Sequence, residues 1–372
     1  MSKDVILGFG AMRLPLTDKN NDSKVNDEEF SKMIDYYMNQ GYNYFDTSYA
    51  YHQEKSEEHL RTQLVERYPR ESFKIADKMP TWLLTGPEDN ERLVNVMLER
   101  LGITYFDVFL IHNINSAFLP LAEKAETFQY IAKMKEEGTA KKVGISYHDK
   151  SDLLEQILEK YGDILDVVQL QLNYLDWESN LTEARKNYEL CEKYGLDVIV
   201  MEPVKGGTLA KLPDNIEQEF KEYNNEYTLP QWALRFAGTP KNVKIVLSGM
   251  NNFQQTKDNC EVFKDFKPIN DEEHEFLQKI ADEINKLIPI PCSYCGYCKK
   301  QCPKEIPIPD YFELYNNQSL YKLESISAIY GTTSAVNTPA SGCIECGNCL
   351  DICPQKINIP EELKKVAKEF GQ

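Results

Sequence analysis

The sequence predicts an α/β protein in which a (β/α)8 TIM barrel precedes a small, mainly α-helical domain. Short apolar runs alternate with amphipathic stretches from residue 5 to about residue 266, and eight of the ten cysteines crowd into residues 292–353. An open doubly wound sheet is the alternative for the first part, but no glycine-rich dinucleotide fingerprint follows the first run, which favours the closed barrel. We therefore expect a barrel domain over residues 1–285 and a cysteine-rich domain over residues 286–372.

Eight apolar runs are the candidate strands of this barrel. Most are nearly continuous, which is typical of parallel strands buried on both faces. The runs are residues 5–10, 42–46, 73–78, 106–112, 142–146, 166–171, 197–202 and 243–248. Amphipathic patterns predict crossover helices between them, including residues 54–68, 89–101, 121–137, 151–161 and 181–194. Eight strands with crossovers in roughly 270 residues fit one closed barrel.

Composition and charge exclude several classes of protein. The chain has 59 acidic against 42 basic residues, a net charge of -17 and a pI near 4.9. This balance argues against nucleic acid or an anionic membrane as the main partner. No apolar run approaches the roughly 18 residues of a membrane span, and the N-terminus has no secretory pattern. We expect a cytoplasmic protein, whose closely spaced cysteines bind metal rather than form disulfides.

The cysteines lie in a motif that occurs twice, as CSYCGYCKKQCP from residue 292 and CIECGNCLDICP from residue 343. The spacing C-x2-C-x2-C-x3-C-P resembles that of bacterial two-cluster ferredoxins, in which the fourth cysteine ligates the other 4Fe–4S cluster. Structural zinc, the alternative, prefers two well-separated CxxC pairs. We expect two 4Fe–4S clusters. The first would be held by Cys292, Cys295, Cys298 and Cys353. The second would be held by Cys343, Cys346, Cys349 and Cys302.

The segments around the two motifs predict an α-helical domain rather than a compact β-rich ferredoxin. Residues 288–291, Ile-Pro-Ile-Pro, are expected to form a stiff linker. Between the motifs, residues 310–329 have a helical pattern, and residues 331–341 are predicted to be a loop.

Four polar residues follow consecutive predicted strands, where barrel enzymes place their chemistry. Asp46 and Tyr51 follow the second strand, Lys78 closes the third and His112 closes the fourth. A tyrosine with a pKa near 10 exchanges protons poorly at neutral pH unless a cation is close. Lys78 can supply that cation, Asp46 can orient it, and His112 can donate to a carbonyl oxygen. The set suits protonation of an alkoxide that forms as a hydride reaches carbon.

Residues 5–266 contain, in this order, the motifs LGFGAMRLP, FDTSYAY, SExxL, IADK and FLIH. In these motifs and their order the barrel resembles the aldo-keto reductase family. The resemblance implies a catalytic tetrad of Tyr51, Asp46, Lys78 and His112, with Tyr51 as general acid/base. It implies NADP or NAD bound across the barrel mouth. The implied cofactor-binding residues are Ser146, Gln169, Met201, Ser248, Gln255, Asp258 and Asn259.

Three positions depart from the family's pattern. Tyr147 stands where Asn is common, and Met201 stands where many members stack an aromatic ring on the nicotinamide. The loop 248–256 has no Lys or Arg, and such cations normally hold a 2′-phosphate. The preference between NADPH and NADH is therefore open, with Lys257 and Lys205 as the nearest basic candidates.

Together these features predict an NAD(P)-dependent oxidoreductase that reduces a small-molecule carbonyl substrate to an alcohol. His52, His148 and the loop 113–120 are expected near the substrate.

In the alternative hypothesis, the clusters exchange electrons with a partner such as a ferredoxin. No flavin motif is visible that would split a two-electron hydride into single electrons. A non-catalytic redox sensor is the third hypothesis, and the intact tetrad argues against it.

Overall fold

The computed structural model describes residues 5–18, 21–116, 118–179, 182–292, 296–321, 324–350, 352–353 and 355–371 of the chain. The chain divides into two compact units. We call Met1–Gly207 with Pro230–His274 the barrel unit, and Thr208–Leu229 with Glu275–Gln372 the cysteine unit. The expected domain division after residue 285 stays a prediction.

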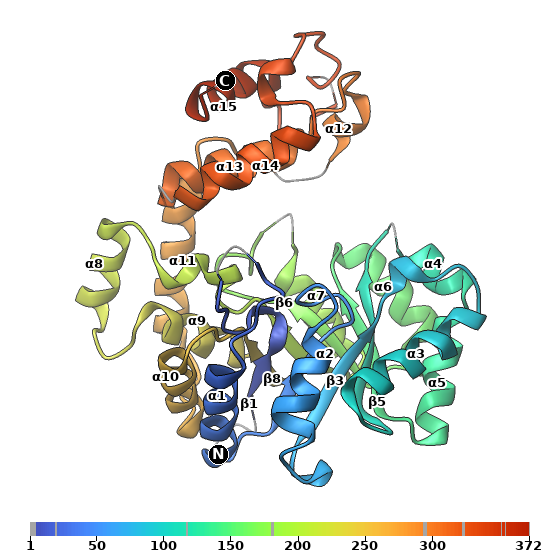
Figure 1. The fold of residues 1–372 in the computed structure, drawn as a ribbon. Coiled ribbons are helices and arrows are strands. Elements are labelled where there is room, and N and C mark those ends of the chain that lie inside the picture. Colours follow the sequence, from blue (N-terminus) through green and yellow to red (C-terminus); the bar gives the residue numbers. More distant parts are fainter. Residues whose placement is uncertain are drawn as a thin grey trace. The chain divides into compact units, whose positions relative to one another are not determined.

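The barrel unit is built on parallel strands that close in sequence order, β1 next to β2 and onward until β8 pairs with β1 (Figure 1). The strands are β1 Ile6–Gly10, β2 Tyr44–Asp46, β3 Lys74–Met79, β4 Phe106–Ile114, β5 Ala140–Tyr147, β6 Val167–Gln171, β7 Asp197–Met201 and β8 Val243–Ser248. Each coincides with one of the predicted runs to within two residues. The closed α/β barrel is thus confirmed.

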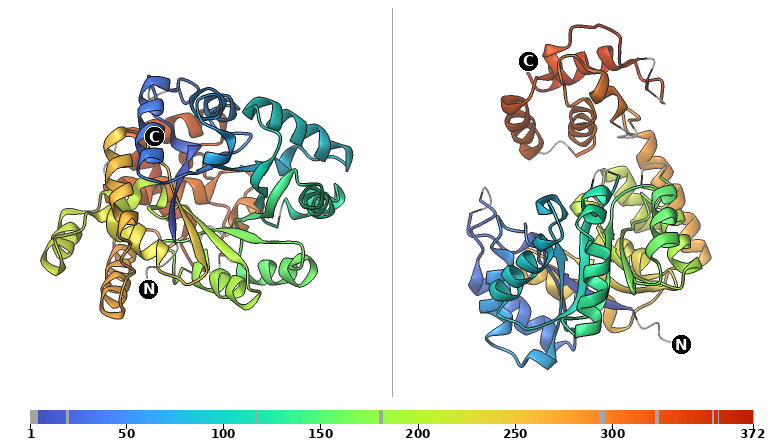
Figure 2. Two further views of the ribbon diagram at one scale, coloured as in Figure 1. Left: turned by 90° about the horizontal axis from the view of Figure 1, so that it is seen from below. Right: turned by 90° about the vertical axis from the view of Figure 1, so that its right-hand side faces the viewer.

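Helices follow the strands and surround the barrel, as the view along it shows (Figure 2). They are α1 Asp27–Asn39, α2 Ser56–Leu60, α3 Glu88–Leu101, α4 Leu119–Lys124, α5 Thr127–Glu137, α6 Ser151–Tyr161, α7 Ala184–Lys193, α9 Leu229–Gly238 and α10 Phe253–Lys264. One expected helix, residues 121–137, is two, because Glu126 adopts a left-handed conformation (φ 54°) between α4 and α5. Another, residues 54–68, is α2 continued by a π-helical turn, Arg61–Val65.

Apolar side chains fill the inside of the barrel. Eight buried residues on six of the strands form one cluster there: Tyr44, Ala76, Val108, Leu110, Val167, Ile199, Ile245 and Leu247. Gly144 of β5 lets β6 approach closely, since any side chain at this position would collide with the carbonyl of Val167. The barrel therefore has a packed interior, and it can bind a ligand only at its ends.

The cysteine unit is helical. Its elements are α8 Asp214–Tyr223, most of α11 Asp271–Lys286, then α12 Tyr297–Gln301, α13 Ile308–Tyr321, α14 Glu324–Val336 and α15 Ile359–Glu369. Its core combines cysteines with buried residues of α13, α14 and α15, such as Phe312, Tyr330 and Val366. Tyr330 stacks on Phe370 with 4.1 Å between ring centroids. No helix in the described parts of the chain is long and apolar enough to span a bilayer.

Two expectations for this unit are wrong. The segment 288–291 is not a free linker, because Ile290 is fully buried and its backbone N–H and C=O both bond to the Asn316 side chain, at 3.0 and 2.8 Å. The expected loop 331–341 is helical as far as Val336. The small polar residues there resemble a loop in sequence, but the helix continues from buried Tyr330, and the Thr333 carbonyl at its end accepts hydrogen bonds from Asn337.

Candidate active site and cysteine cavities

The candidate active-site residues occupy the inward-facing positions that come just after the apolar interior. Side chains alternate between the two faces of a strand, so residues two apart share a face. Tyr44, Ala76 and Leu110 belong to the interior cluster, and Asp46, Lys78 and His112 follow two residues later. Ser146 and Gln169 take equivalent places on β5 and β6, paired in register. One rule of strand geometry thus brings these polar groups to one end of the barrel.

Lys78 is fully buried and held by two oxygen atoms. Its Nζ donates to Asp46 Oδ1 and to the Thr47 carbonyl, both at 2.6 Å. Gln169 Nε2 donates to the other Asp46 oxygen at 3.0 Å. Burial alone would lower the pKa of Lys78, but Asp46 and Tyr51 beside it raise that pKa above its ordinary value, so the ammonium stays charged.

Tyr51 and His112 flank this ammonium. The Nζ of Lys78 lies 5.1 Å from the Tyr51 ring centroid, and the Tyr51 and His112 rings meet edge-on at 6.1 Å. Burial raises the pKa of Tyr51 while Lys78 acts to lower it. Burial, with the charges of Lys78 and His148, holds the pKa of His112 well below its ordinary value. At neutral pH the tyrosine is therefore protonated and the imidazole is neutral.

The residues expected to bind the cofactor lie at the same end of the barrel or on α10. Met201 and Ser248 end β7 and β8. The Ser248 hydroxyl accepts a hydrogen bond from Asn259 Nδ2 at 2.9 Å. Gln255 accepts from the Asn251 N–H, and Asp258 is exposed on α10. Their assignment to a cofactor stays a prediction.

Of the two histidines expected near the substrate, only one faces the candidate site. His148 does face the site, with its Nε2 2.9 Å from the Ser146 hydroxyl. His52 does not: it is buried, and its two ring nitrogens bond to the Leu14 N–H and the Asp22 carbonyl. It ties down the loop after β1 instead, so the expectation that it contacts substrate is wrong.

Sequence analysis missed two residues next to His112. The Ser48 hydroxyl lies 2.9 Å from His112 Nδ1, and the Trp82 ring lies 5.3 Å from the imidazole centroid. Phe118, which lies in the expected substrate loop, is 6.4 Å from Trp82. An available signal for Trp82 was its place just after the third predicted strand. The Trp82 and Phe118 rings form an apolar wall beside His112.

Behind Lys78, two buried carboxyl groups face each other. Asp77 on β3 and Glu57 on α2 are both fully buried, and Asp77 Oδ2 and Glu57 Oε1 have no hydrogen-bond donor among the described residues. Burial raises the pKa of Glu57 to about 7 and, together with Glu57, raises that of Asp77 well above its ordinary value. Arg100 Nη1 binds the other Glu57 oxygen at 3.0 Å. The pair therefore shares a proton at neutral pH.

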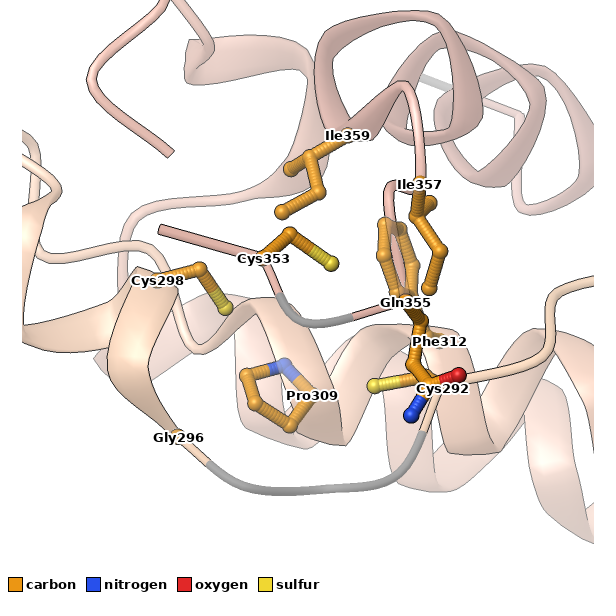
Figure 3. Close-up of a pocket in the computed structure, with 9 residues that line it drawn as sticks. All are labelled: Cys292, Gly296, Cys298, Pro309, Phe312, Cys353, Gln355, Ile357 and Ile359. Atoms are coloured by element: carbon orange, nitrogen blue, oxygen red, sulfur yellow. The ribbon is translucent and has the colours of Figure 1, made fainter. Parts of the chain in front are cut away.

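In the cysteine unit, one cavity of about 310 Å3 is lined by Cys292, Cys298 and Cys353. Their sulfur atoms turn toward a common space (Figure 3). Cys295, expected at the same centre, lies outside the described residues. Apolar side chains, among them Phe312 and Ile359, complete the lining.

A second cavity, of about 330 Å3, is lined by cysteines of both motifs: Cys302, Cys343, Cys346 and Cys349. Burial and the three neighbouring thiols raise the pKa of Cys349 to about 11. Bound iron would have to displace such a proton. Within the described residues no three side chains converge on a single ion, and a cubane cluster differs in taking each thiolate on a different iron. The donor sets among the described residues, three cysteines in the first cavity and four in the second, fit such a cluster.

The remaining two cysteines belong to the barrel unit. Cys191 and Cys260 are buried on α7 and α10, and burial raises the pKa of both thiols, that of Cys260 to about 12. They pack as small apolar side chains.

Comparisons with known proteins agree with both parts of the chain. Residues 6–282 match the model of the aldo/keto reductase family, and residues 291–357 match that of a 4Fe-4S dicluster domain. An uncharacterized oxidoreductase of Schizosaccharomyces pombe is 28% identical over 244 residues, 62% of this chain and 73% of that protein. The NADH-specific methylglyoxal reductase of Escherichia coli is 28% identical over 190 residues, 45% of this chain and 54% of that protein.

Solved structures share the barrel fold. An aldo-keto reductase from Bacillus halodurans in its holo form superposes with a TM-score of 0.58 at 23% identity, covering 74% of this chain and 91% of that one. An aldo-keto reductase from Klebsiella pneumoniae in complex with NADPH gives a TM-score of 0.59 at 19% identity, with 76% and 95% covered.

The shared proton of Glu57 and Asp77 predicts how stability depends on pH. Both carboxyl groups have pKa values raised above their ordinary values, so the folded protein keeps a proton on the pair that the unfolded chain releases above about pH 4.5. The stabilisation is therefore complete below that pH and lost as the pH rises through about 7. We expect Glu57→Gln to flatten the fall in unfolding free energy over this range, by up to about 3 kcal/mol.

Urea unfolding under anaerobic conditions at several pH values measures this slope. Glu58→Gln is the matched control, since Glu58 is the next residue and pairs with Lys55 at the surface. An unchanged slope in Glu57→Gln would show that the pair holds no shared proton.

The two cavities predict which cysteines share a cluster. Cys298 and Cys353 line one cavity, whereas Cys302 lines the other. Replacing Cys298 and Cys353 together by Ala should cost one cluster and leave about half the iron, while replacing Cys298 and Cys302 together should cost both. Iron and sulfide analysis of anaerobically purified variants, with Cys191→Ala as control, distinguishes the cases. The reverse pattern would mean that each motif holds its own cluster.

Proposed function

The chain belongs to the aldo/keto reductase family, and from this premise we propose that it reduces a small-molecule carbonyl substrate to an alcohol with Tyr51 as the proton donor. The observation that carries this proposal is the buried Lys78 ammonium, bound to Asp46 at 2.6 Å and lying beside the Tyr51 ring, which His112 also contacts edge-on. These are the groups that a carbonyl oxygen needs as negative charge develops on it.

The polar residues on the neighbouring strands suit a nicotinamide. The side-chain amide N–H of Gln169 donates to Asp46. Among the described contacts, the side-chain oxygen of Gln169 can therefore accept a hydrogen bond from the carboxamide N–H of the nicotinamide. The Ser146 hydroxyl, next to it in register, can donate to the carboxamide oxygen. A bound nicotinamide would supply the hydride. Ser146 and Gln169 would hold it at the barrel mouth, near Tyr51.

In this proposal Tyr51 is the acid, and two opposing effects set its pKa, which lies above the ordinary value. Burial raises that pKa, which would make the hydroxyl a poor donor, and the Lys78 charge opposes the rise. As the proton leaves Tyr51 for the substrate oxygen, the ammonium stabilises the negative charge that remains on the phenolic oxygen. Asp46 keeps Lys78 charged and in place. It has no need to touch the substrate.

His112 is a hydrogen-bond donor to the same oxygen. Its pKa is held far below neutrality, so it cannot itself be the acid that is protonated at pH 7. When the Ser48 hydroxyl donates to Nδ1, which lies 2.9 Å from it, the ring proton is on Nε2. A neutral Nε2–H stabilises the forming alkoxide without taking the proton that Tyr51 supplies.

In the cysteine unit we propose two 4Fe–4S clusters with crossed ligation, each cavity taking three cysteines of one motif and the fourth of the other. Electron exchange with a carrier such as a ferredoxin is a second candidate function. The second cavity favours it, because Cys346 on its lining is exposed and Ile344 beside it is 56% exposed. A one-electron carrier could approach that centre closely.

For the choice of cofactor, Lys205 is not free to bind a 2′-phosphate, since it is bound to Asp176 at 2.7 Å. Lys257 is exposed on α10 and is the residue that we propose to contact that phosphate. One relative is NADH-specific and one structural neighbour holds NADPH, so the two dinucleotides are to be tested side by side.

Replacing Tyr51 by Phe tests the proposed acid. We expect carbonyl reduction to fall by at least about 100-fold, because general acid catalysis contributes about that much, while dinucleotide affinity and cluster absorbance stay unchanged. Anaerobic steady-state assays with NADH and NADPH over a set of aldehydes and ketones measure the rate.

Tyr49→Phe is the matched control. It removes a hydroxyl two residues away and keeps the ring on which Arg100 stacks at 4.2 Å. Wild-type rates in Tyr51→Phe would remove Tyr51 from the mechanism.

A further inference from the structure

Arg13 is a cation at the same end of the barrel as the candidate active site, and none of the roles above uses it. It ends the short 3-10 turn Ala11–Arg13 that directly follows β1. In the register of the barrel, Gly10 pairs with Asp46 on one side, and Phe9 pairs with Ser248 on the other. β1 therefore lies between the strand that ends at Asp46 and the strand that ends at Ser248, and Arg13 follows β1.

The side chain of Arg13 lies between two glycine-containing loops. Its stem packs over Gly249, just after β8: a Cβ built there would lie 3.4 Å from the Arg13 Cβ. Its guanidinium reaches the loop after β7, where a Cβ built on Gly206 would lie 3.2 Å from Arg13 Nη2. The absence of side chains at both glycines leaves room for the arginine.

The loop after β7 has an open surface at this point. Gly206 and Gly207 both have positive φ, 66° and 104°, which side chains rarely tolerate. A Cβ built on Gly207 would meet nothing within 4 Å. Ligand atoms can therefore approach the backbone here, next to the guanidinium.

Arg13 is also available for binding. It is half-buried, and within the described residues it makes no hydrogen bond or ion pair. Lys205, the basic residue of the same loop, is instead bound to Asp176, which also accepts from Gln171 and Asn173 at 2.8 Å each. In a chain with a net charge of -17, an anionic ligand needs such a local cation to overcome general repulsion.

We propose that Arg13 binds the pyrophosphate of the nicotinamide dinucleotide, beside the backbone of Gly206 and Gly207. The planar guanidinium can contact two phosphate oxygens at once, which lysine cannot do. This proposal rests on the proposed function, since it requires a dinucleotide at the barrel mouth. Arg13, in the turn after β1, would thus contact the pyrophosphate, which NADH and NADPH share. Another residue would contact the 2′-phosphate of NADPH.

The test is the affinity of the full, anaerobically purified protein for NADH and for NADPH, measured by nicotinamide fluorescence. We expect Arg13→Gln to weaken both by a similar factor of about 10- to 100-fold, as for a lost hydrogen bond to a charged group. Arg13→Lys should recover part of the loss, because it keeps the charge but not the fork. Lys244→Gln is the control, since Lys244 is exposed near the start of β8, at the other end of that strand.

Each other result contradicts the proposal in its own way. A loss for NADPH alone would place Arg13 on the 2′-phosphate. No loss for either dinucleotide would show that the charge at residue 13 contacts no phosphate. If the wild-type protein binds neither dinucleotide, the proposed function fails and the role of Arg13 fails with it.

Discussion

The buried contact between Lys78 and Asp46 is the interaction on which the candidate active site depends. An ammonium with no exposed surface is costly unless it is paired and hydrogen-bonded. Here Asp46 and the Thr47 carbonyl both accept from it, and Gln169 holds the second carboxylate oxygen. The pair links β2, β3 and β6 across the barrel mouth. It keeps a positive charge beside Tyr51 before any ligand arrives, so little reorganisation is needed when charge develops.

Much of this arrangement could be predicted from the sequence because it follows from two periodic rules. Parallel strands in a closed barrel end on the same side, and side chains alternate along each strand. Asp46, Lys78 and His112 therefore had to converge once the strands were recognised. The cysteine motifs also predicted the type of cluster, because the size of a cluster determines their spacing.

The features that sequence analysis missed depend on contacts between distant segments. The carboxyl pair of Glu57 and Asp77 exists only because α2 packs against β3. The position of His52 in the sequence suggests the barrel mouth, but both of its ring nitrogens bond to the backbone of the loop after β1. The segment 288–291 has the composition of a linker, yet Asn316, far along the chain, binds it into a core. No local pattern signals such pairings.

The two proposed kinds of cofactor transfer different numbers of electrons. A nicotinamide gives two electrons as a hydride, whereas each 4Fe–4S cluster accepts one, and no flavin motif in the sequence suggests a way to split the pair. In the proposed function, a bound nicotinamide and the groups around Tyr51 carry out the two-electron reduction of a carbonyl. The most direct measurement is an anaerobic titration of the cluster-loaded protein with NADPH and NADH, following nicotinamide and cluster absorbance together. Our account predicts that nicotinamide is oxidised only when a carbonyl substrate is added and that the cluster absorbance does not change. Bleaching of the clusters by nicotinamide alone would contradict it.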